Sequence, residues 1–568
     1  MHVTSDQSSW WRHAVLYQIY PRSFADSDGD GVGDLPGIIE HLPYLRDLGV
    51  DGIWISPFYV SPMADAGYDV ADYRDVDPLF GTLADADAFL TRAHELGLKV
   101  VVDLVPNHSS DEHAWFQAAL AAAPGSRERA RYLFRDGQGV DGELPPNNWQ
   151  SVFGGPAWTR VMEADGRPGQ WYLHLFDAKQ PDFDWENEEV RAEFHAILRF
   201  WLDRGVDGFR VDVAHSLVKQ AGLPDWDEPQ HLLGDTDDPL VHTGNVASVR
   251  PPMWDQDGVH EVYRAWRSIL NEYNVAGDAD ADRVLCAEAW VEPPSRAVRY
   301  IRGDEMHQSF NFDFLMAAWR ADRLREVIEL SYRWCDSVGA PATWVLSNHD
   351  VVRHASRLGL PIGTRRPNGI GIGDPQPDAE LGLRRARAAT ALMLALPGAA
   401  YLYQGEELGL PEHTELPDEV RQDPAWERNG HTERGRDGCR IPFPWTADGP
   451  SLGFGPTANA WLPQPDSYAG LAADTQAGAE GSTLELYRRL LALRAEHRLG
   501  VGSLHWLDGY GEDVVALGNL DLDRRPVGVV VNLGPASVPL PPQAVVLAAS
   551  GPLDQGRVPT DTGVWFLA

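Results

Sequence analysis

Cysteine is scarce in this chain of 568 residues. The three that occur, Cys286, Cys335 and Cys439, are too few for a disulfide framework. None has a second cysteine at the C-x-x-C spacing that is typical of structural zinc sites. We therefore expect free, buried thiols in a reducing compartment, and a fold that is held together by its hydrophobic core.

Basic residues are also few, since 48 lysines and arginines stand against 84 acidic residues and the formal net charge is −36. Nucleic acids and anionic membranes attract basic surfaces, so this balance argues against both as partners. The composition instead favours a small, neutral molecule as substrate. We expect the protein to act as a monomer or a homodimer.

Long hydrophobic runs are missing as well. The stretch "ATALMLALPGAAYL" is short for a membrane span and is interrupted by Pro397. The chain begins with the polar run "HVTSDQSS", where a secretory signal would carry an apolar core. The sequence therefore predicts a cytoplasmic protein.

Short apolar runs alternate with amphipathic helical segments along most of the chain. The runs are dense in valine and leucine, as parallel strands buried on both faces are. The helices between them end at glycines such as Gly49 and Gly97. Repeated βα units of this kind predict a parallel sheet, and eight of them can close into a barrel. The eight expected strands are 14–24, 50–58, 99–108, 206–215, 284–290, 308–314, 343–350 and 399–409.

Two parts of the chain depart from this alternation. Residues 109–182 are irregular and too long for a plain loop, which indicates an inserted subdomain after the third strand. After residue 500, short β-prone runs are broken by Gly, Pro and Asp, which indicates a small antiparallel domain. The predicted fold is an α/β (β/α)8 TIM barrel built from 1–108 and 183–499, with an inserted subdomain at 109–182 and a C-terminal antiparallel β domain at 500–568.

Acidic residues end several of the expected strands, and the active site of such barrels lies at those strand ends. Asp212 and Glu288 each interrupt an apolar run, and a structural ion pair explains either one alone equally well. Arg210 lies on the same face as Asp212, so its charge should lower the pKa of Asp212. Glu288 has no cation nearby in the sequence, so its pKa could rise. One anionic and one protonated carboxyl group is the arrangement that hydrolyses glycosides.

Several short segments resemble the signature motifs of the α-amylase superfamily (glycoside hydrolase family 13), in its α-glucosidase and oligo-1,6-glucosidase branch. They occur in the family's order and extend over nearly the whole chain. The resemblance implies the same barrel, insertion and C-terminal domain, and no organic cofactor. The segments are "GVDGIWISP" (49–57), "DLVPNH" (103–108), "QPDFDW" (180–185), "GFRVDVAH" (208–215), "CAEAW" (286–290), "SNHD" (347–350) and "PGAAYLYQGEELG" (397–409).

The resemblance also implies roles for single residues. Asp212 matches the nucleophile, Glu288 the general acid/base, and Asp350 the third carboxylate, which grips sugar hydroxyls. Tyr68 matches a stacking platform, and Asp69 the acid that holds the non-reducing end of the substrate and pairs with Arg440. The histidines match groups that bond glucose hydroxyls. The full set of expected substrate-binding residues is Tyr68, Asp69, His108, Phe153, Arg210, His349 and Arg440.

The predicted activity is that of a retaining, exo-acting α-glucosidase on short α-glucosides, with transfer of glucose to an acceptor as a second outcome. The preferred linkage stays open: "QPDFDW" departs from the motif of enzymes that cut α-1,6 bonds, whereas Val213 is the residue type associated with that activity. The alternatives are an isomerase or transferase of the trehalose synthase or sucrose isomerase type, and a non-catalytic sugar-binding homologue.

The stretch "DSDGDGVGDL" (26–35) looks like the start of an EF-hand calcium loop. The acid that a full EF-hand needs at its twelfth position is absent, because Gly37 stands there. Relatives in the branch bind calcium or magnesium at this loop, so we expect a structural Ca²⁺ or Mg²⁺ here; a solvated acidic turn is the alternative. The expected ligands are Asp26, Asp28, Asp30, Asp34 and the carbonyl of Val32.

Overall fold

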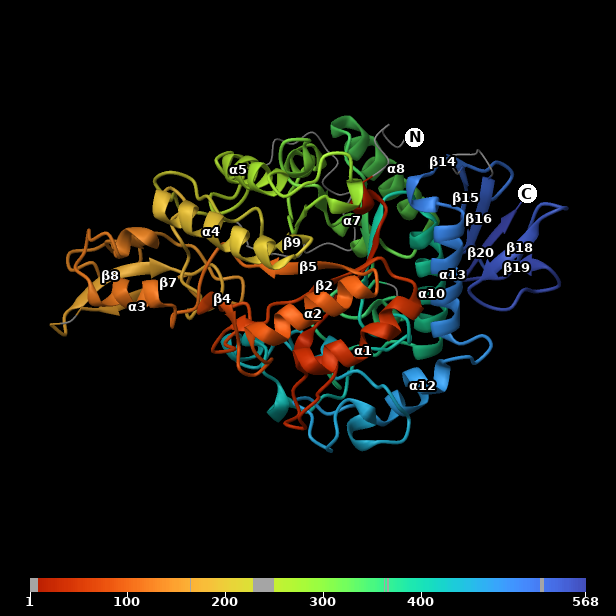
Figure 1. The fold of residues 1–568 in the computed structure, drawn as a ribbon, viewed down its shortest axis with the longest axis horizontal. Helices are drawn as coiled ribbons and strands as arrows, with labels where there is room; N and C mark the ends of the chain where they lie inside the picture. The colour runs from red at the N-terminus through yellow and green to blue at the C-terminus, as the bar shows by residue number, and fades with distance from the viewer. Residues whose placement is uncertain are drawn as a thin grey trace.

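The computed structural model describes residues 9–163, 165–227, 250–361, 363–364, 367–520 and 526–567. Its centre is a parallel sheet in the order β11-β10-β9-β5-β2-β1-β13-β12. Figure 1 shows β2, β5 and β9 of this sheet near the centre of the molecule. The backbone N–H of Asn311, just after β11, donates to the carbonyl of Thr343 in β12 at 2.8 Å, so the two ends of the sheet meet. The predicted eight-stranded barrel is thus confirmed. Its strands are β1 (Val15–Ile19), β2 (Gly52–Ile55), β5 (Lys99–Leu104), β9 (Gly208–Val211), β10 (Val284–Ala287), β11 (Gln308–Ser309), β12 (Thr343–Val345) and β13 (Ala399–Tyr403).

Helices surround the barrel, and local sequence signals set their ends. The Asp34 side chain accepts a hydrogen bond from the N–H of Gly37 and begins α1, which ends at Gly49 in the left-handed conformation (φ 95°). Thr82 and Asp85 form a reciprocal capping box at the start of α2. The longer helices are α1 (Leu35–Leu48), α2 (Leu83–Glu95), α4 (Glu188–Arg204), α5 (Val259–Asn271), α8 (Ala321–Val338), α10 (Ala379–Ala395) and α13 (Thr483–Glu496).

The sixth barrel strand is shorter than the sequence predicts. We expected a strand over 308–314, but β11 covers only Gln308–Ser309. The side chain of Asn311 accepts a hydrogen bond from the N–H of Phe314 and so caps a short helix, α7 (Phe312–Met316). An apolar run next to a capping residue fits a strand or a helix, and here the cap decided the outcome.

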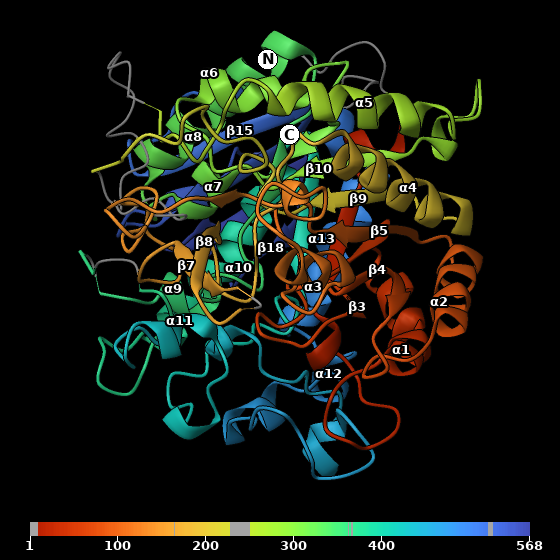
Figure 2. The same ribbon diagram turned by 90° about the vertical axis from the view of Figure 1, so that its left-hand side faces the viewer.

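The chain between β5 and β9 carries a small antiparallel sheet in the order β6-β8-β7. It consists of β6 (Phe134–Arg135), β8 (Pro168–Leu173) and β7 (Trp158–Met162). Phe116 of helix α3 (Ala114–Ala121) packs against the rings of Phe134 and Tyr172 of this sheet. Figure 2 places this subdomain in front of the barrel and the C-terminal sheet behind it. A second addition, the hairpin β3 (Tyr59–Val60) and β4 (Asp72–Val76), follows β2.

The predicted C-terminal antiparallel domain is present. Its main sheet has the order β14-β15-β16-β20-β18. The sheet rests on α10, where the indole N–H of Trp565 donates to the carbonyl of Ala391 at 2.8 Å. The strands are β14 (Ser503–Trp506), β15 (Val514–Leu520), β16 (Pro526–Asn532), β18 (Val545–Ala549) and β20 (Thr562–Leu567). Two further short strands, β17 (Val538–Pro539) and β19 (Arg557–Val558), pair with each other.

The interior of the barrel is filled with side chains, among them Leu16, Trp54, Val101 and Tyr401. A packed interior leaves the rim as the place for a site. No helix in the described part of the chain is long and apolar enough to span a membrane.

Candidate active site

A pocket of about 100 Å³ opens at the carboxyl ends of the barrel strands. Six of the residues expected from the sequence line it: five lie in segments that follow the barrel strands β2, β5, β9, β10 and β12, and Phe153 lies in the inserted subdomain. Of the other lining residues, Val213, Trp290 and Asn348 lie in motifs that the sequence analysis quoted, and the rest lie in segments that it did not. The lining residues are Asp65, Tyr68, His108, Val152, Phe153, Phe176, Asp212, Val213, Glu288, Trp290, Asn348, Asp350, Asn368, Ala425 and Arg436.

A single buried guanidinium holds the acidic groups of this pocket together. Arg210 Nη1 lies 2.7 Å from Asp212 Oδ1 and 2.9 Å from Asp103 Oδ1, and Arg210 Nη2 lies 2.6 Å from Glu288 Oε2. The expected pair of carboxylates, Asp212 and Glu288, therefore shares one cation. Arg210 itself does not line the pocket, because its guanidinium lies buried among these three acids.

The charges of this cluster correct one expectation. Burial raises the pKa of Asp212, Arg210 lowers it, and the net direction is upward, whereas the sequence predicted a lowered pKa. Burial likewise raises the pKa of Asp103 to about 6, although Arg210 opposes the rise. The prediction failed because it considered Arg210 and left out burial, which has the largest effect on the pKa of Asp212; Glu288 and Asp103, which share Arg210, raise that pKa further. Three carboxyl groups around one arginine have surplus negative charge, so one of these carboxyl groups readily retains a proton. Acid catalysis requires a carboxyl group that is protonated.

Val213, directly after the expected nucleophile, has a backbone conformation that is rare for a β-branched residue (φ 39°). In this conformation its N–H donates to Glu288 Oε2 at 3.1 Å. Ser216 holds the turn, since its backbone N–H and its hydroxyl both donate to the carbonyl of Val213. The strained residue therefore gives the expected acid/base a second fixed contact.

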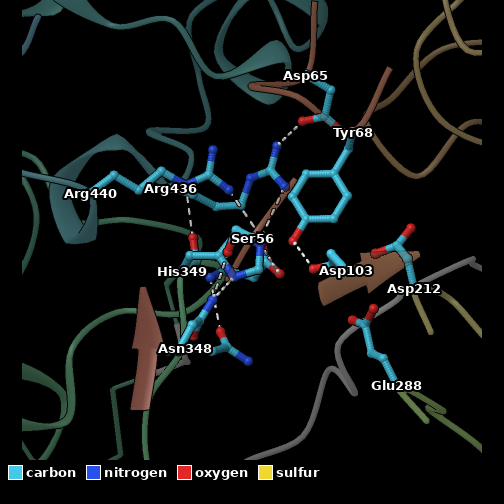
Figure 3. Close-up of polar contacts among 12 residues, drawn as sticks. Ser56, Asp65, Tyr68, Asp103, Asp212, Glu288, Asn348, His349, Arg436 and Arg440 are labelled. Atoms are coloured by element: carbon cyan, nitrogen blue, oxygen red, sulfur yellow. Dashed lines mark hydrogen bonds and ion pairs between the residues drawn. The ribbon is translucent and has the colours of Figure 1, made fainter. Parts of the chain in front are cut away.

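A second arginine, Arg436, lines the pocket, and Figure 3 shows its guanidinium beside the carboxylate of Asp65. Its Nη2 lies 2.7 Å from Asp65 Oδ1, its Nη1 lies 3.1 Å from Asp350 Oδ1, and its Nε lies 2.5 Å from Asp423 Oδ2. The guanidinium also lies over the ring of Phe153, 5.1 Å from its centre. The chain segments that follow β2, β12 and β13 meet at this one side chain.

The expected pairing of Asp69 with Arg440 is wrong. The carboxylate of Asp69 is fully buried and accepts from Ser61 and from the backbone N–H groups of Ala64 and Asp65. Arg440 instead donates to Asp350 Oδ1 at 3.0 Å and to the carbonyl of His349 at 2.8 Å.

The acid that faces the pocket is Asp65, and the base that pairs with it is Arg436. Each lies only four residues before the residue that the sequence suggested. The sequence analysis named only Asp69 and Arg440, because spacing along the chain does not show which acid and which arginine of a loop meet in space.

Asp350 lies among three basic side chains. Burial raises the pKa of Asp350, whereas His349, Arg436 and Arg440 lower it. The lowering is larger than the rise, so the net shift of the pKa is downward. Asp350 is therefore held as an anion. His349 lies behind the pocket wall, where its ring stacks on that of Tyr68 with 5.3 Å between ring centres.

His108 is held by the motif "QPDFDW" at the end of the inserted subdomain. Its Nε2 lies 3.1 Å from the amide nitrogen of Gln180, and Asn107, which precedes it, donates to Asp182 at 3.1 Å. Lys219 pairs with the same aspartate at 2.9 Å. Burial lowers the pKa of His108 to about 4, so the ring stays neutral near pH 7. The role of the motif is therefore to position this histidine.

The aspartate-rich loop brings three of its carboxylates together. Oxygen atoms of Asp26, Asp28 and Asp34 lie within 4.8 Å of one another, which suits a hard cation. The N–H groups of Gly29 and Gly31 donate to Asp26 and hold the loop in a tight turn. Asp30 is outside this group of three, and its carboxylate accepts from the N–H of Val32. That the carbonyl of Val32 is a further ligand of the cation stays a prediction.

Comparison with known proteins agrees with this geometry. Residues 18–501 match the family model described as "Alpha amylase, catalytic domain". The chain belongs to the α-amylase family.

Three proteins are similar to this chain over most of its length. A "Probable alpha-glucosidase" of Rhizobium meliloti is 38% identical over 519 residues, covering 88% of this chain and 86% of its own. An alpha-glucosyl transfer enzyme, XgtA, whose crystal structure is known, is 37% identical to this chain in sequence. The two structures match with a TM-score of 0.80, covering 99% of this chain and 100% of XgtA. A variant of the trehalulose synthase MutB is 29% identical, with a TM-score of 0.81 over 98% of this chain and 100% of its own.

The buried histidine gives a testable pH dependence. In the unfolded chain His108 takes a proton below its ordinary pKa of 6.5, but in the folded chain it does so only near pH 4. Its contribution to stability is thus complete above pH 6.5 and is lost as the pH falls to about 4. The gap of about 2.5 pH units, at about 1.36 kcal/mol per unit, corresponds to about 3 kcal/mol.

Urea unfolding at pH 7 and at pH 4.5 measures this effect. We expect the natural protein to lose about 2 to 3 kcal/mol more stability than a His108→Asn variant between these two pH values. A His431→Asn variant, which changes an exposed histidine, is the matched control and should behave like the natural protein. Equal losses in the natural protein and in His108→Asn would contradict the assignment.

Proposed function

We propose that this protein is a retaining, exo-acting α-glucosidase that releases glucose from the non-reducing end of short α-glucosides. The observation that carries the proposal is the pair Asp212 and Glu288, which share Arg210 at the base of a small pocket. Asp65 and Arg436 block one end of that pocket, which favours a single terminal glucose over the middle of a long chain.

In the proposed reaction, Asp212 attacks the anomeric carbon of the glucose while Glu288 donates a proton to the glycosidic oxygen. This forms a covalent glucosyl ester and releases the rest of the substrate. Glu288 then takes a proton from water, which attacks the same carbon and frees Asp212. The anionic Asp350 and the neighbouring acids stabilise the positive charge that develops on the sugar ring in both steps.

Transfer to another alcohol and isomerisation use the same glucosyl ester. The resemblance to an alpha-glucosyl transfer enzyme and to a trehalulose synthase favours transfer as a second outcome. The residues of the pocket leave the preferred linkage open, because Val213 and the motif at 180–185 point to different linkages.

A substrate panel tests the proposal. We expect glucose from at least one of maltose, isomaltose and sucrose, with the products identified by chromatography. A product disaccharide from sucrose or maltose without glucose would favour the isomerase alternative. No product from any of the three would refute the proposal.

Replacing Glu288 tests its role as the general acid. Glu288→Gln keeps the shape but has no proton to donate, so we expect kcat on maltose to fall by about 10² to 10⁴. Glu480→Gln, which changes an exposed acid outside the pocket, is the control and should retain its kcat. Full turnover by Glu288→Gln would contradict the assignment.

The arginine that closes the pocket gives a second kinetic prediction. Arg436→Ala leaves Asp65 and Asp423 buried without their cation. A hydrogen bond to a charged group contributes about 1.5 to 3 kcal/mol. We therefore expect kcat/KM on maltose to fall about 10- to 100-fold. Arg434→Ala, two residues away and outside the pocket, is the matched control. Equal kcat/KM values for the two variants would show that Arg436 does not support the site.

We further propose that the aspartate-rich loop binds a structural Ca²⁺ or Mg²⁺ through Asp26, Asp28 and Asp34. Three carboxylates this close repel one another, and a bound cation would relieve that repulsion. The loop leads directly into α1, whose first turn is capped by the third of these acids. The cation would thus stabilise the fold and leave the sugar chemistry to the pocket.

Chelation tests the metal site. We expect the melting temperature to fall by several degrees after treatment with EDTA, because a ligand that binds only the folded state stabilises it. Added Ca²⁺ or Mg²⁺ should restore it. An Asp28→Asn variant should show a smaller loss on chelation, and an unchanged melting temperature in the natural protein would rule out the site.

A further inference from the structure

A glutamine on the first barrel strand lies among side chains that are otherwise apolar or aromatic. Gln18 is only 1% exposed, and the rest of β1 reads Val, Leu, Tyr and Ile. Successive side chains of a strand point to opposite faces, so Gln18 lies on the same inner face of the barrel as Leu16. Burying a carboxamide costs free energy unless its polar atoms find partners. The contacts of Gln18 therefore indicate its role.

Gln18 contacts the active site through His349. Its amide nitrogen lies 2.7 Å from His349 Nδ1 and 3.2 Å from Ser56 Oγ, inside the barrel. Its amide oxygen has no hydrogen-bond partner among the described residues, so the fold itself gains little from this side chain. An amide nitrogen donates and does not accept. The Nδ1 atom of the histidine ring is therefore the acceptor of this hydrogen bond.

The ring of His349 is held in one orientation. It is fully buried and stacks on the rings of Tyr68 and Tyr20, with 5.3 Å and 5.9 Å between ring centres. Its second nitrogen, Nε2, lies 3.3 Å from Asp350 Oδ2. Each ring nitrogen thus has one fixed neighbour, the amide of Gln18 at Nδ1 and a carboxylate at Nε2.

The ring carries a single proton. Burial lowers the pKa of His349 well below its ordinary value; Asp350 opposes this effect, and three nearby arginines add to it. A neutral imidazole is protonated at one nitrogen only. A proton on Nδ1 would face the N–H of Gln18 and would turn the lone pair of Nε2 toward an anion. A proton on Nε2 suits both neighbours.

We propose that Gln18 is a positioning residue of the active site, which fixes the tautomer of His349 with the proton on Nε2. In this tautomer an N–H faces Asp350 Oδ2, while Arg436 and Arg440 donate to Asp350 Oδ1. The carboxylate is then held from both of its oxygens. Gln18 does not line the pocket, so it acts through the histidine. Its effect on catalysis rests on the proposed function, whereas the tautomer does not.

NMR spectroscopy of protein labelled with ¹⁵N at histidine tests the tautomer, because the chemical shift separates a protonated ring nitrogen from an unprotonated one. We expect the natural protein at pH 8 to show His349 with a protonated Nε2 and an unprotonated Nδ1. The signals of His349 are identified by their absence from a His349→Asn variant. A protonated Nδ1 in the natural protein would overturn the inference.

Two substitutions change the group that faces Nδ1 in different ways. Gln18→Glu keeps the size but presents an acceptor, so we expect Nδ1 to become protonated. We expect kcat/KM on the substrate that the panel identifies to fall about tenfold or more, since changing the outer partner of a histidine costs about 10- to 100-fold in metal sites. Gln18→Met presents neither donor nor acceptor. Asp350 then still favours the proton on Nε2, and kcat/KM should fall less than about threefold.

Gln308 offers a matched control. It is fully buried on another barrel strand, β11, where its side chain donates to the carbonyl of Trp11 and accepts from the hydroxyl of Tyr401. Gln308→Met thus removes a comparable set of contacts away from the pocket. It should leave the His349 signals unchanged and alter kcat/KM less than about twofold. Melting curves verify that each variant is folded.

The outcomes separate this inference from the proposed function. An unchanged tautomer in Gln18→Glu, or equal losses of kcat/KM in folded Gln18→Glu and Gln18→Met, would show that Gln18 is only a structural contact and would overturn the inference. If the natural protein releases no glucose from maltose, isomaltose or sucrose, the proposed function fails, and the ¹⁵N spectra still decide the tautomer.

Discussion

The site depends on one buried cation, Arg210. Burying an ion costs on the order of several kcal/mol unless partners compensate for the lost water. Here the partners are Asp103 from β5, Asp212 just after β9, and Glu288 just after β10. Three neighbouring strands of the barrel thus meet at one guanidinium. The barrel fixes the distances between these acids, and the surplus of negative charge sets how they hold protons.

A second buried cation, Arg436, has the corresponding role among the loops. It joins Asp65, Asp350 and Asp423, which come from three different loops around the rim. These loops have little regular structure, so the shared ion pairs rather than a sheet hold them in place. Arg210 joins three acids at the base of the pocket, whereas Arg436 joins three of the loops that surround it. The first depends on strand order, and the second on the closing of loops.

Repeated patterns made most of the fold predictable from the sequence. The eight strands were readable because each is a short apolar run between amphipathic helices, and parallel strands need just such runs. The prediction failed at 308–314, where the side chain of Asn311 accepts a hydrogen bond from the N–H of Phe314 and caps α7 in place of a longer strand. Single capping contacts of this kind decide between nearly equal local structures, and the periodicity of the sequence does not contain them.

The sequence by itself determined which residue types gather at the rim, because strand ends of a parallel barrel all face the same way. It therefore placed Asp212, Glu288 and Asp350 at one site. Only the tertiary structure decided which groups pair. It joined Asp65 to Arg436 instead of Asp69 to Arg440, and it raised the pKa of Asp212 that a local argument would lower. Pairing and pKa depend on distance and burial in space, which segments far apart in the chain create together.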